Sequence, residues 1–131
     1  MRIAVDTNVL VRAVVRDDAA QYESATGIMA WAETVAIVAT SLCELAWVLR
    51  SVYRFQPSDI SRAIRILVAA ANVETNHPAV EAGLATLDAG GDFADGVIAY
   101  EGRWLGGEMF VSFDKRAVDM LTAQGESARL L

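Results

Sequence analysis

Hydrophobic positions along the chain fall into short continuous runs that are separated by longer stretches with a helical repeat. The short runs predict five strands, at residues 3–5, 35–38, 73–75, 109–113 and 128–131. Between the runs, apolar residues recur every three or four positions, which predicts helices. These cover about residues 8–15, 17–32, 41–55, 57–71, 78–89, 92–105 and 115–123. Because strands alternate with helices, we expect an α/β fold whose sheet is parallel and covered on both faces.

Composition narrows the class of protein. The 131 residues include 54% hydrophobic ones, enough for the core of one domain spanning residues 1–131. No linker, repeat or low-complexity segment interrupts the sequence. The formal net charge of -6 argues against a protein that wraps nucleic acid with a basic surface, but not against a nuclease whose carboxylates bind metal.

Apolar runs are too short for a membrane span or a signal peptide, so a cytoplasmic protein without a membrane partner is expected. The single cysteine, Cys43, has no partner for an internal disulfide. Its apolar neighbours favour a small core residue over a nucleophile.

Acidic residues fall where predicted strands end and the following helices begin. Asp6 and Asp114 each follow a strand directly. Glu44 lies early in the helix after the second strand, and Asp92 and Asp95 open the helix that follows a glycine pair. Since the carboxyl ends of parallel strands lie at one edge of a sheet, where ligands bind, we expect these acids to converge there.

A cluster of ionised carboxylates repels itself, so a cation is expected to offset the repulsion. Carboxylate oxygens without histidine or cysteine are the ligand set of Mg²⁺ or Mn²⁺. Zinc is a poor match, because His77 is the only histidine and Cys43 the only cysteine.

Helix capping is a second interpretation of the same acids. Ser41 and Glu44 fit a capping box, Asp92 is a natural N-cap with another acid in the first turn, and Asp114 precedes the last helix. Capping explains Asp6 less readily, and it does not explain why all these acids fall at one predicted edge. One aspartate can also cap a helix and bind a metal.

Other side chains that could take part in catalysis or binding are more simply explained by their place in the fold. His77 lacks a partner at a recognisable spacing and is expected at the surface. Trp31, Trp47 and Trp104 lie on apolar helix faces, which favours core or interface over base stacking.

Three basic residues lie close in sequence to the predicted acids. Arg12 follows Asp6, and Lys115 and Arg116 follow Asp114. They are candidates for contact with substrate phosphate, although charge on a solvated helix surface is the commoner role.

Four motifs give the sequence a family resemblance. DTNVL, TSLCELAWVLRSVY, GGDFADGVIA and VSFDKRA follow one another in this order over essentially the whole chain. In this order and spacing they resemble the motifs of PIN-domain ribonucleases of the VapC-like toxin type.

The resemblance implies a three-layer α/β/α sandwich with a central, mainly parallel sheet. It also implies an endoribonuclease that needs Mg²⁺ or Mn²⁺. The family's catalytic and metal-binding acids correspond to Asp6, Glu44, Asp95 and Asp114, with Asp92 as an additional nearby acid.

The resemblance also implies supporting residues and partners. Asn8 corresponds to the family's asparagine, expected to support the site by hydrogen bonding, and Ser112 keeps the hydroxyl of a more usual threonine. Gly96 stands where alanine is more usual in the family. Neither this glycine nor Ser112 replaces a residue that is expected to bind metal. Proteins of this type are commonly homodimers and toxins held inactive by a cognate antitoxin, a segment of which packs on the toxin.

The expected chemistry is metal-assisted hydrolysis of an RNA phosphodiester by water. Asp6, Asp95 and Asp114 would hold one or two ions, and Glu44 would complete the shell or act through water. A phosphatase with an aspartate nucleophile is one rival, but it needs a second acid where this chain has Asn8. A PIN-like module that binds RNA or a protein partner without turnover is the alternative from another class.

Overall fold

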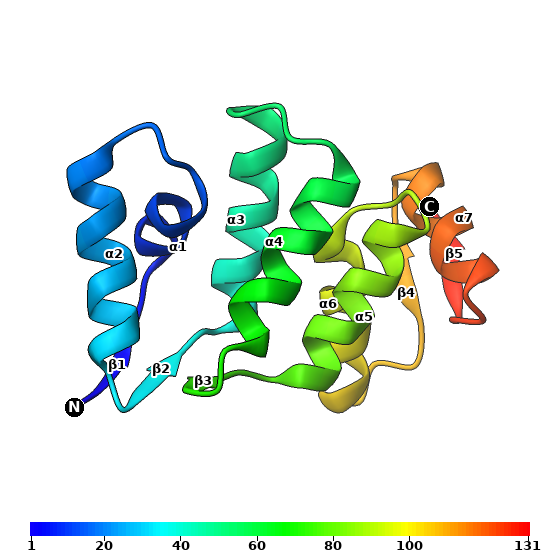
Figure 1. Ribbon diagram of the computed structural model, residues 1–131. Coiled ribbons are helices and arrows are strands. Elements are labelled where there is room, and N and C mark those ends of the chain that lie inside the picture. Colours follow the sequence, from blue (N-terminus) through cyan, green and yellow to red (C-terminus); the bar gives the residue numbers. More distant parts are fainter. The chain divides into compact units, whose positions relative to one another are not determined.

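Seven helices and five short strands, all paired in parallel, form the chain in a computed structural model that describes every residue from Met1 to Leu131 (Figure 1). In chain order the elements are β1 (Arg2–Ala4), α1 (Thr7–Val14), α2 (Ala19–Trp31), β2 (Thr34–Ala36), α3 (Ala39–Ser51), α4 (Pro57–Ala69), β3 (Val73–Glu74), α5 (His77–Asp88), α6 (Phe93–Trp104), β4 (Phe110–Ser112), α7 (Lys115–Ala123) and β5 (Ala128–Leu130). Every predicted strand and helix is present. The prediction of a mixed α/β fold with parallel strands is confirmed.

Two compact units divide the chain, and each is described by itself. Unit 1 is Met1–Asn76 and unit 2 is His77–Leu131. In unit 1, blue to green in Figure 1, the strands form one parallel sheet in the order β1-β2-β3. Its helix α1 packs against α2 and α3, and α3 packs against α4. Three of these helices, α1, α3 and α4, carry fully buried leucine and isoleucine side chains of the core: Leu10, Leu42, Leu45, Leu49, Ile60 and Ile64.

Unit 2 is built around the close pair of helices α5 and α6, with the parallel pair β4-β5 beside α7. Two glycines make the helix pair possible. A Cβ atom at Gly83 would lie 2.6 Å from the ring of Phe93, and one at Gly96 would lie 2.3 Å from the carbonyl oxygen of Ala82. The glycine that follows Asp95, where the family resemblance leads one to expect alanine, is therefore required by packing.

Helix α3 begins two residues before the predicted Ser41 and ends at Ser51, short of the predicted Phe55. Its N-cap is Val38, whose side chain cannot cap, and Ser41 lies inside the helix and is buried. The predicted capping box of Ser41 and Glu44 is therefore wrong. Burying Ala39 together with Ser41 and Leu42 outweighs the weaker preference for a polar cap at the helix start.

Several surface predictions can be compared with the structure. The three tryptophans are exposed, with 63% of Trp31, 67% of Trp47 and 76% of Trp104 accessible, so the core alternative is wrong and the interface alternative stays a prediction. Cys43 is half-buried rather than a core residue. His77 is exposed, as predicted. None of the seven helices has the length and apolar character that crossing a membrane requires.

Candidate functional site

The predicted site residues are divided between the two units. Asp6 and Glu44 belong to unit 1, and Asp92, Asp95 and Asp114 belong to unit 2. The geometry of each group is therefore described within its own unit.

Asp6 is exposed and is the N-cap of α1. Its Oδ1 accepts a hydrogen bond of 3.1 Å from the backbone N–H of Val9, whereas Oδ2 accepts none. Since the carboxylate is exposed, the burial cost that a strand-end aspartate would otherwise carry does not arise. Asp6 caps a helix with one oxygen, and its other oxygen accepts no hydrogen bond.

Glu44 lies in the second turn of α3, where its side chain points to α1. Its Oε2 accepts a hydrogen bond of 2.7 Å from the hydroxyl of Thr7, the first residue of α1. Sequence reasoning missed Thr7, although a hydroxyl directly after Asp6 was a visible signal. The two predicted acids of unit 1 are thus linked: Glu44 is bonded to the residue that follows Asp6.

Asp114 is the N-cap of α7, as one of the two sequence interpretations anticipated. Its Oδ1 accepts hydrogen bonds from the backbone N–H groups of Arg116, at 3.0 Å, and Ala117, at 3.3 Å. Its own N–H donates to Oγ of Ser112 at 2.9 Å. Ser112 therefore helps to fix the backbone of Asp114, and Oδ2 of Asp114 accepts no hydrogen bond.

Asp92 and Asp95 differ from the other acids because their side chains accept no hydrogen bond. Asp92 occupies the N-cap position of α6, yet its carboxylate makes no capping contact. Asp95 is half-buried in the first turn, where the helix dipole favours a negative charge. Burial, followed by the charges of Asp92 and Asp114, nevertheless raises the pKa of Asp95 above its ordinary value. Capping does not account for these two acids, and their crowding has an electrostatic cost.

Comparison with protein families gives one match, to the PIN domain, over residues 3–120. This chain belongs to the PIN-domain family. PIN domains are typically metal-dependent nucleases, and membership of the family suggests RNA binding. The sequence matches no curated protein.

The remaining predicted residues of this PIN domain are one asparagine and three basic residues. Asn8 is exposed and its side chain makes no hydrogen bond. Arg12 pairs with Asp17 at 2.8 Å, Lys115 pairs with Asp119 at 2.6 Å, and a guanidinium N–H of Arg116 donates to the carbonyl of Gly90. The supporting role of Asn8 and the phosphate contacts of the three basic residues stay predictions.

The acids of this PIN domain suit a hard divalent cation by their donor chemistry. Within neither unit do three or more histidine, cysteine, aspartate or glutamate side chains lie close enough together to hold a metal ion. Each unit nevertheless supplies carboxylate oxygens without nitrogen or sulfur donors, the set that Mg²⁺ and Mn²⁺ prefer. Burial, and then the charges of Asp92 and Asp114, raise the pKa of Asp95, and a cation beside it would favour its charged form.

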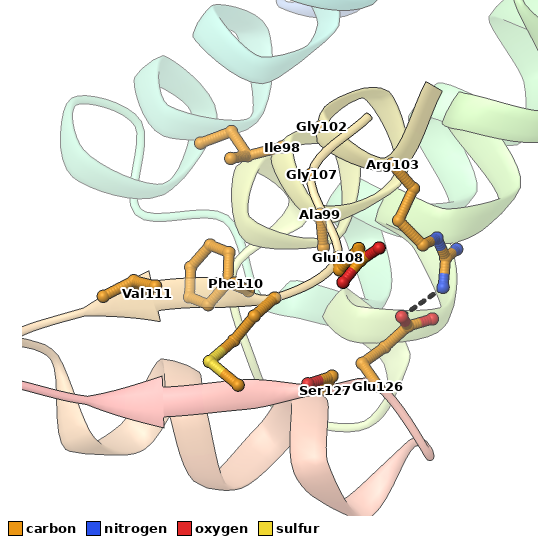
Figure 2. Close-up of a pocket in the computed structure, with 11 residues that line it drawn as sticks. Ile98, Ala99, Gly102, Arg103, Gly107, Glu108, Phe110, Val111, Glu126 and Ser127 are labelled. Atoms are coloured by element: carbon orange, nitrogen blue, oxygen red, sulfur yellow. Dashed lines mark hydrogen bonds and ion pairs between the residues drawn. The ribbon is translucent and has the colours of Figure 1, made fainter. Parts of the chain in front are cut away.

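A separate cavity of about 190 Å³ lies in unit 2 between α6 and strand β4 (Figure 2). Ile98, Phe110 and Val111 provide apolar walls, and the ion pair of Arg103 with Glu126 lies at one end. None of the five predicted acids lines this cavity. It is therefore not part of the candidate site of the PIN domain.

Proposed function

We propose that this PIN domain is an endoribonuclease that requires Mg²⁺ or Mn²⁺, and that it acts as the toxin of a toxin-antitoxin pair. The family match over residues 3–120 supports nuclease activity in general. The observation that supports the metal requirement is the environment of Asp95, whose pKa is raised by burial and then by the charges of Asp92 and Asp114, with no hydrogen bond to its side chain to offset them. A divalent cation is the simplest group that removes this cost.

In this proposal Asp6, Asp95 and Asp114 hold the metal, Glu44 completes the shell directly or through water, and Asp92 is an additional acid. When bound, the metal supplies a nucleophilic water and neutralises charge on the phosphodiester. Asp6 and Asp114 each use Oδ1 to cap a helix, which fixes the carboxylate while Oδ2 stays available. No side-chain nucleophile is needed.

The test is RNA cleavage by the purified protein with Mg²⁺, with Mn²⁺ and with excess EDTA. Asp6→Asn is the informative variant, because asparagine also caps helices well and the fold should persist. We expect cleavage to fall by on the order of 100-fold or more. Asp18→Asn is its matched control, since Asp18 caps α2 through an equivalent 3.0 Å bond from the N–H of Gln21 and is not a predicted site residue.

Cleavage that is equal in EDTA and in Mg²⁺, or full activity of Asp6→Asn, would contradict the proposal. Retained RNA binding without any cleavage would favour the alternative, a PIN-like binding module. Electrophoretic mobility shifts on the same RNA distinguish these outcomes.

The toxin role rests on the resemblance of the four sequence motifs to VapC-like proteins. We expect expression of the wild-type chain to arrest bacterial growth, and expression of Asp6→Asn not to do so. A neighbouring gene that encodes a small protein with a DNA-binding domain and a short tail would supply the antitoxin, and its co-expression should restore growth. Normal growth on wild-type expression, with the protein active in vitro, would refute the toxin role but not the nuclease.

Homodimer formation is part of the same proposal. The exposed Trp31, Trp47 and Trp104 provide apolar surface of the kind that protein interfaces bury. Light scattering coupled to size-exclusion chromatography should give twice the 14.1 kDa mass of the chain.

A further inference from the structure

One hydrogen bond in unit 1 links a predicted site acid to a residue outside the predicted site. The hydroxyl of Thr7 donates to Oε2 of Glu44 at 2.7 Å, across 37 positions of sequence. This distance is the usual one for a hydroxyl that donates to a carboxylate, and such charge-assisted bonds are stronger than bonds between neutral groups.

Stability is a poor explanation for this contact. Glu44 is exposed and Thr7 is half-buried, and polar contacts at such exposure contribute little to folding. Helices α1 and α3 already pack against each other, and each has fully buried leucines: Leu10 on α1, and Leu42 and Leu45 on α3. The bond therefore has more influence on where the Glu44 carboxylate points than on whether the helices associate.

The hydroxyl donor lies at the capped start of a helix. Thr7 is the first residue of α1 and directly follows Asp6, whose carboxylate fixes the helix start by accepting the N–H of Val9. Glutamate has a long side chain that loses much rotamer freedom when it is held in place. A hydroxyl at a fixed helix start restricts that freedom before any ligand arrives, and it leaves Oε1 of Glu44 without a hydrogen bond.

We propose that Thr7 is a positioning residue: it orients the carboxylate of Glu44 beside the chain segment of Asp6, so that the two acids of unit 1 are arranged for a divalent cation in advance. This inference rests on the proposed metal-dependent function and adds a residue to it. Thr7 acts through Glu44 and contacts neither metal nor RNA.

The experiment measures Mn²⁺ binding by isothermal titration calorimetry without RNA, and then RNA cleavage at low and saturating Mn²⁺. Thr7→Val replaces the hydroxyl with a methyl group of similar size. We expect it to weaken Mn²⁺ binding on the order of 10-fold, the usual effect of removing a residue that orients a metal ligand. Cleavage should fall mainly at low Mn²⁺ and recover at saturation. Thr7→Ser keeps the hydroxyl and should recover most of the lost affinity.

Two controls separate positioning from folding. Thr26→Val is the matched substitution, because Thr26 is also half-buried on a helix of unit 1 but its hydroxyl bonds locally to the carbonyl of Tyr22. It should leave Mn²⁺ affinity unchanged. Thermal unfolding in EDTA should be the same for Thr7→Val and the wild-type protein, whereas a merely structural role would lower the unfolding temperature of Thr7→Val.

A double-mutant cycle decides whether Thr7 acts through Glu44. In a Glu44→Ala background, Thr7→Val should cause no further loss of Mn²⁺ affinity. A full 10-fold loss in that background, or equal Mn²⁺ affinities of wild type and Thr7→Val, would overturn the inference and leave the proposed function standing. A wild-type protein that binds no Mn²⁺ and cleaves no RNA would overturn the proposed function, and this inference with it.

Discussion

Units 1 and 2 hold their acids in different ways. In unit 1, Asp6 and Glu44 each accept a hydrogen bond from a residue at the start of α1. In unit 2, Asp114 accepts two capping hydrogen bonds, but Asp92 and Asp95 accept none, and the pKa of Asp95 is raised by burial and then by its acidic neighbours. Unit 1 thus holds two proposed metal ligands by hydrogen bonds, whereas two of the three acids in unit 2 have no hydrogen bond to balance their charge.

Overall charge follows the same division. Unit 1 contains seven basic and eight acidic residues, while unit 2 contains four basic and nine acidic ones. Most of the net charge of the chain therefore lies in unit 2. A bound cation would reduce the repulsion between carboxylates more in unit 2 than in unit 1. Removing the metal should therefore raise this repulsion more among the acids of unit 2.

The largest expected effect is on cleavage, and it should differ between the units. Asp95→Asn removes a proposed direct ligand from the most crowded position, and we expect RNA cleavage to fall by on the order of 1,000-fold. Glu44→Gln should lower cleavage less, by roughly 10- to 100-fold, because Glu44 completes the shell. Single-turnover cleavage assays measure both. Glu101→Gln, on the same helix as Asp95 and exposed, is the control. A larger loss for Glu44→Gln than for Asp95→Asn would reverse the comparison.

Metal should also stabilise the folded protein. At a free Mg²⁺ concentration 100 times the dissociation constant, the free energy of unfolding should rise by about 2.7 kcal/mol. Thermal denaturation with Mg²⁺ and with EDTA measures this rise. Asp95→Asn should lose most of it, and Glu101→Gln should keep it. If Asp95→Asn were stabilised by Mg²⁺ as much as the wild type, the acids of unit 2 would not be the main ligands.

Much of the fold was predictable because its signals are local. Apolar periodicity located all seven helices and five strands, and residues with strong backbone preferences fixed several boundaries. Pro57 begins α4 at its first turn, and Asp18 and Asp114 accept capping hydrogen bonds at the predicted starts of α2 and α7.

The start of α3 and the contact of Thr7 with Glu44 were not predictable in the same way. Both depend on contacts between elements far apart in sequence: burial of Ser41 and Leu42 displaces the predicted capping box, and the pairing of α1 with α3 brings Thr7 to Glu44. A sequence pattern shows which residue types recur, but it does not show which distant residues they contact in the fold. The convergence of the acids of both units on one metal stays a prediction.

The glycine at position 96 is also explained by tertiary packing alone. The third prediction tests this packing. Gly96→Ala would place a methyl group against the backbone of α5, so we expect the free energy of unfolding to fall by about 1 to 3 kcal/mol. Gly102→Ala is the matched control on the same helix, where an added Cβ meets nothing within 4 Å. It should raise stability by about 0.5 to 1 kcal/mol, because alanine favours helices. Urea unfolding measures both, and a stabilising Gly96→Ala would show that α5 and α6 are less closely packed.

The smallest expected effect is on how the free energy of unfolding depends on pH. It tests the raised pKa of Asp95 in the absence of metal. Because its pKa is higher in the folded than in the unfolded protein, the folded state holds the proton to higher pH, and stability falls as pH rises from about 4 through the folded pKa. In EDTA at pH 7, Asp95→Asn should therefore be more stable than wild type, by less than about 1 kcal/mol because the half-exposed charge is screened. This difference should vanish as pH falls below about 4, where both states carry a protonated Asp95. Urea unfolding between these pH values tests the sign: if Asp95→Asn were less stable at pH 7, the carboxylate of Asp95 would be stabilising without metal, and the contrast between the two units would fail.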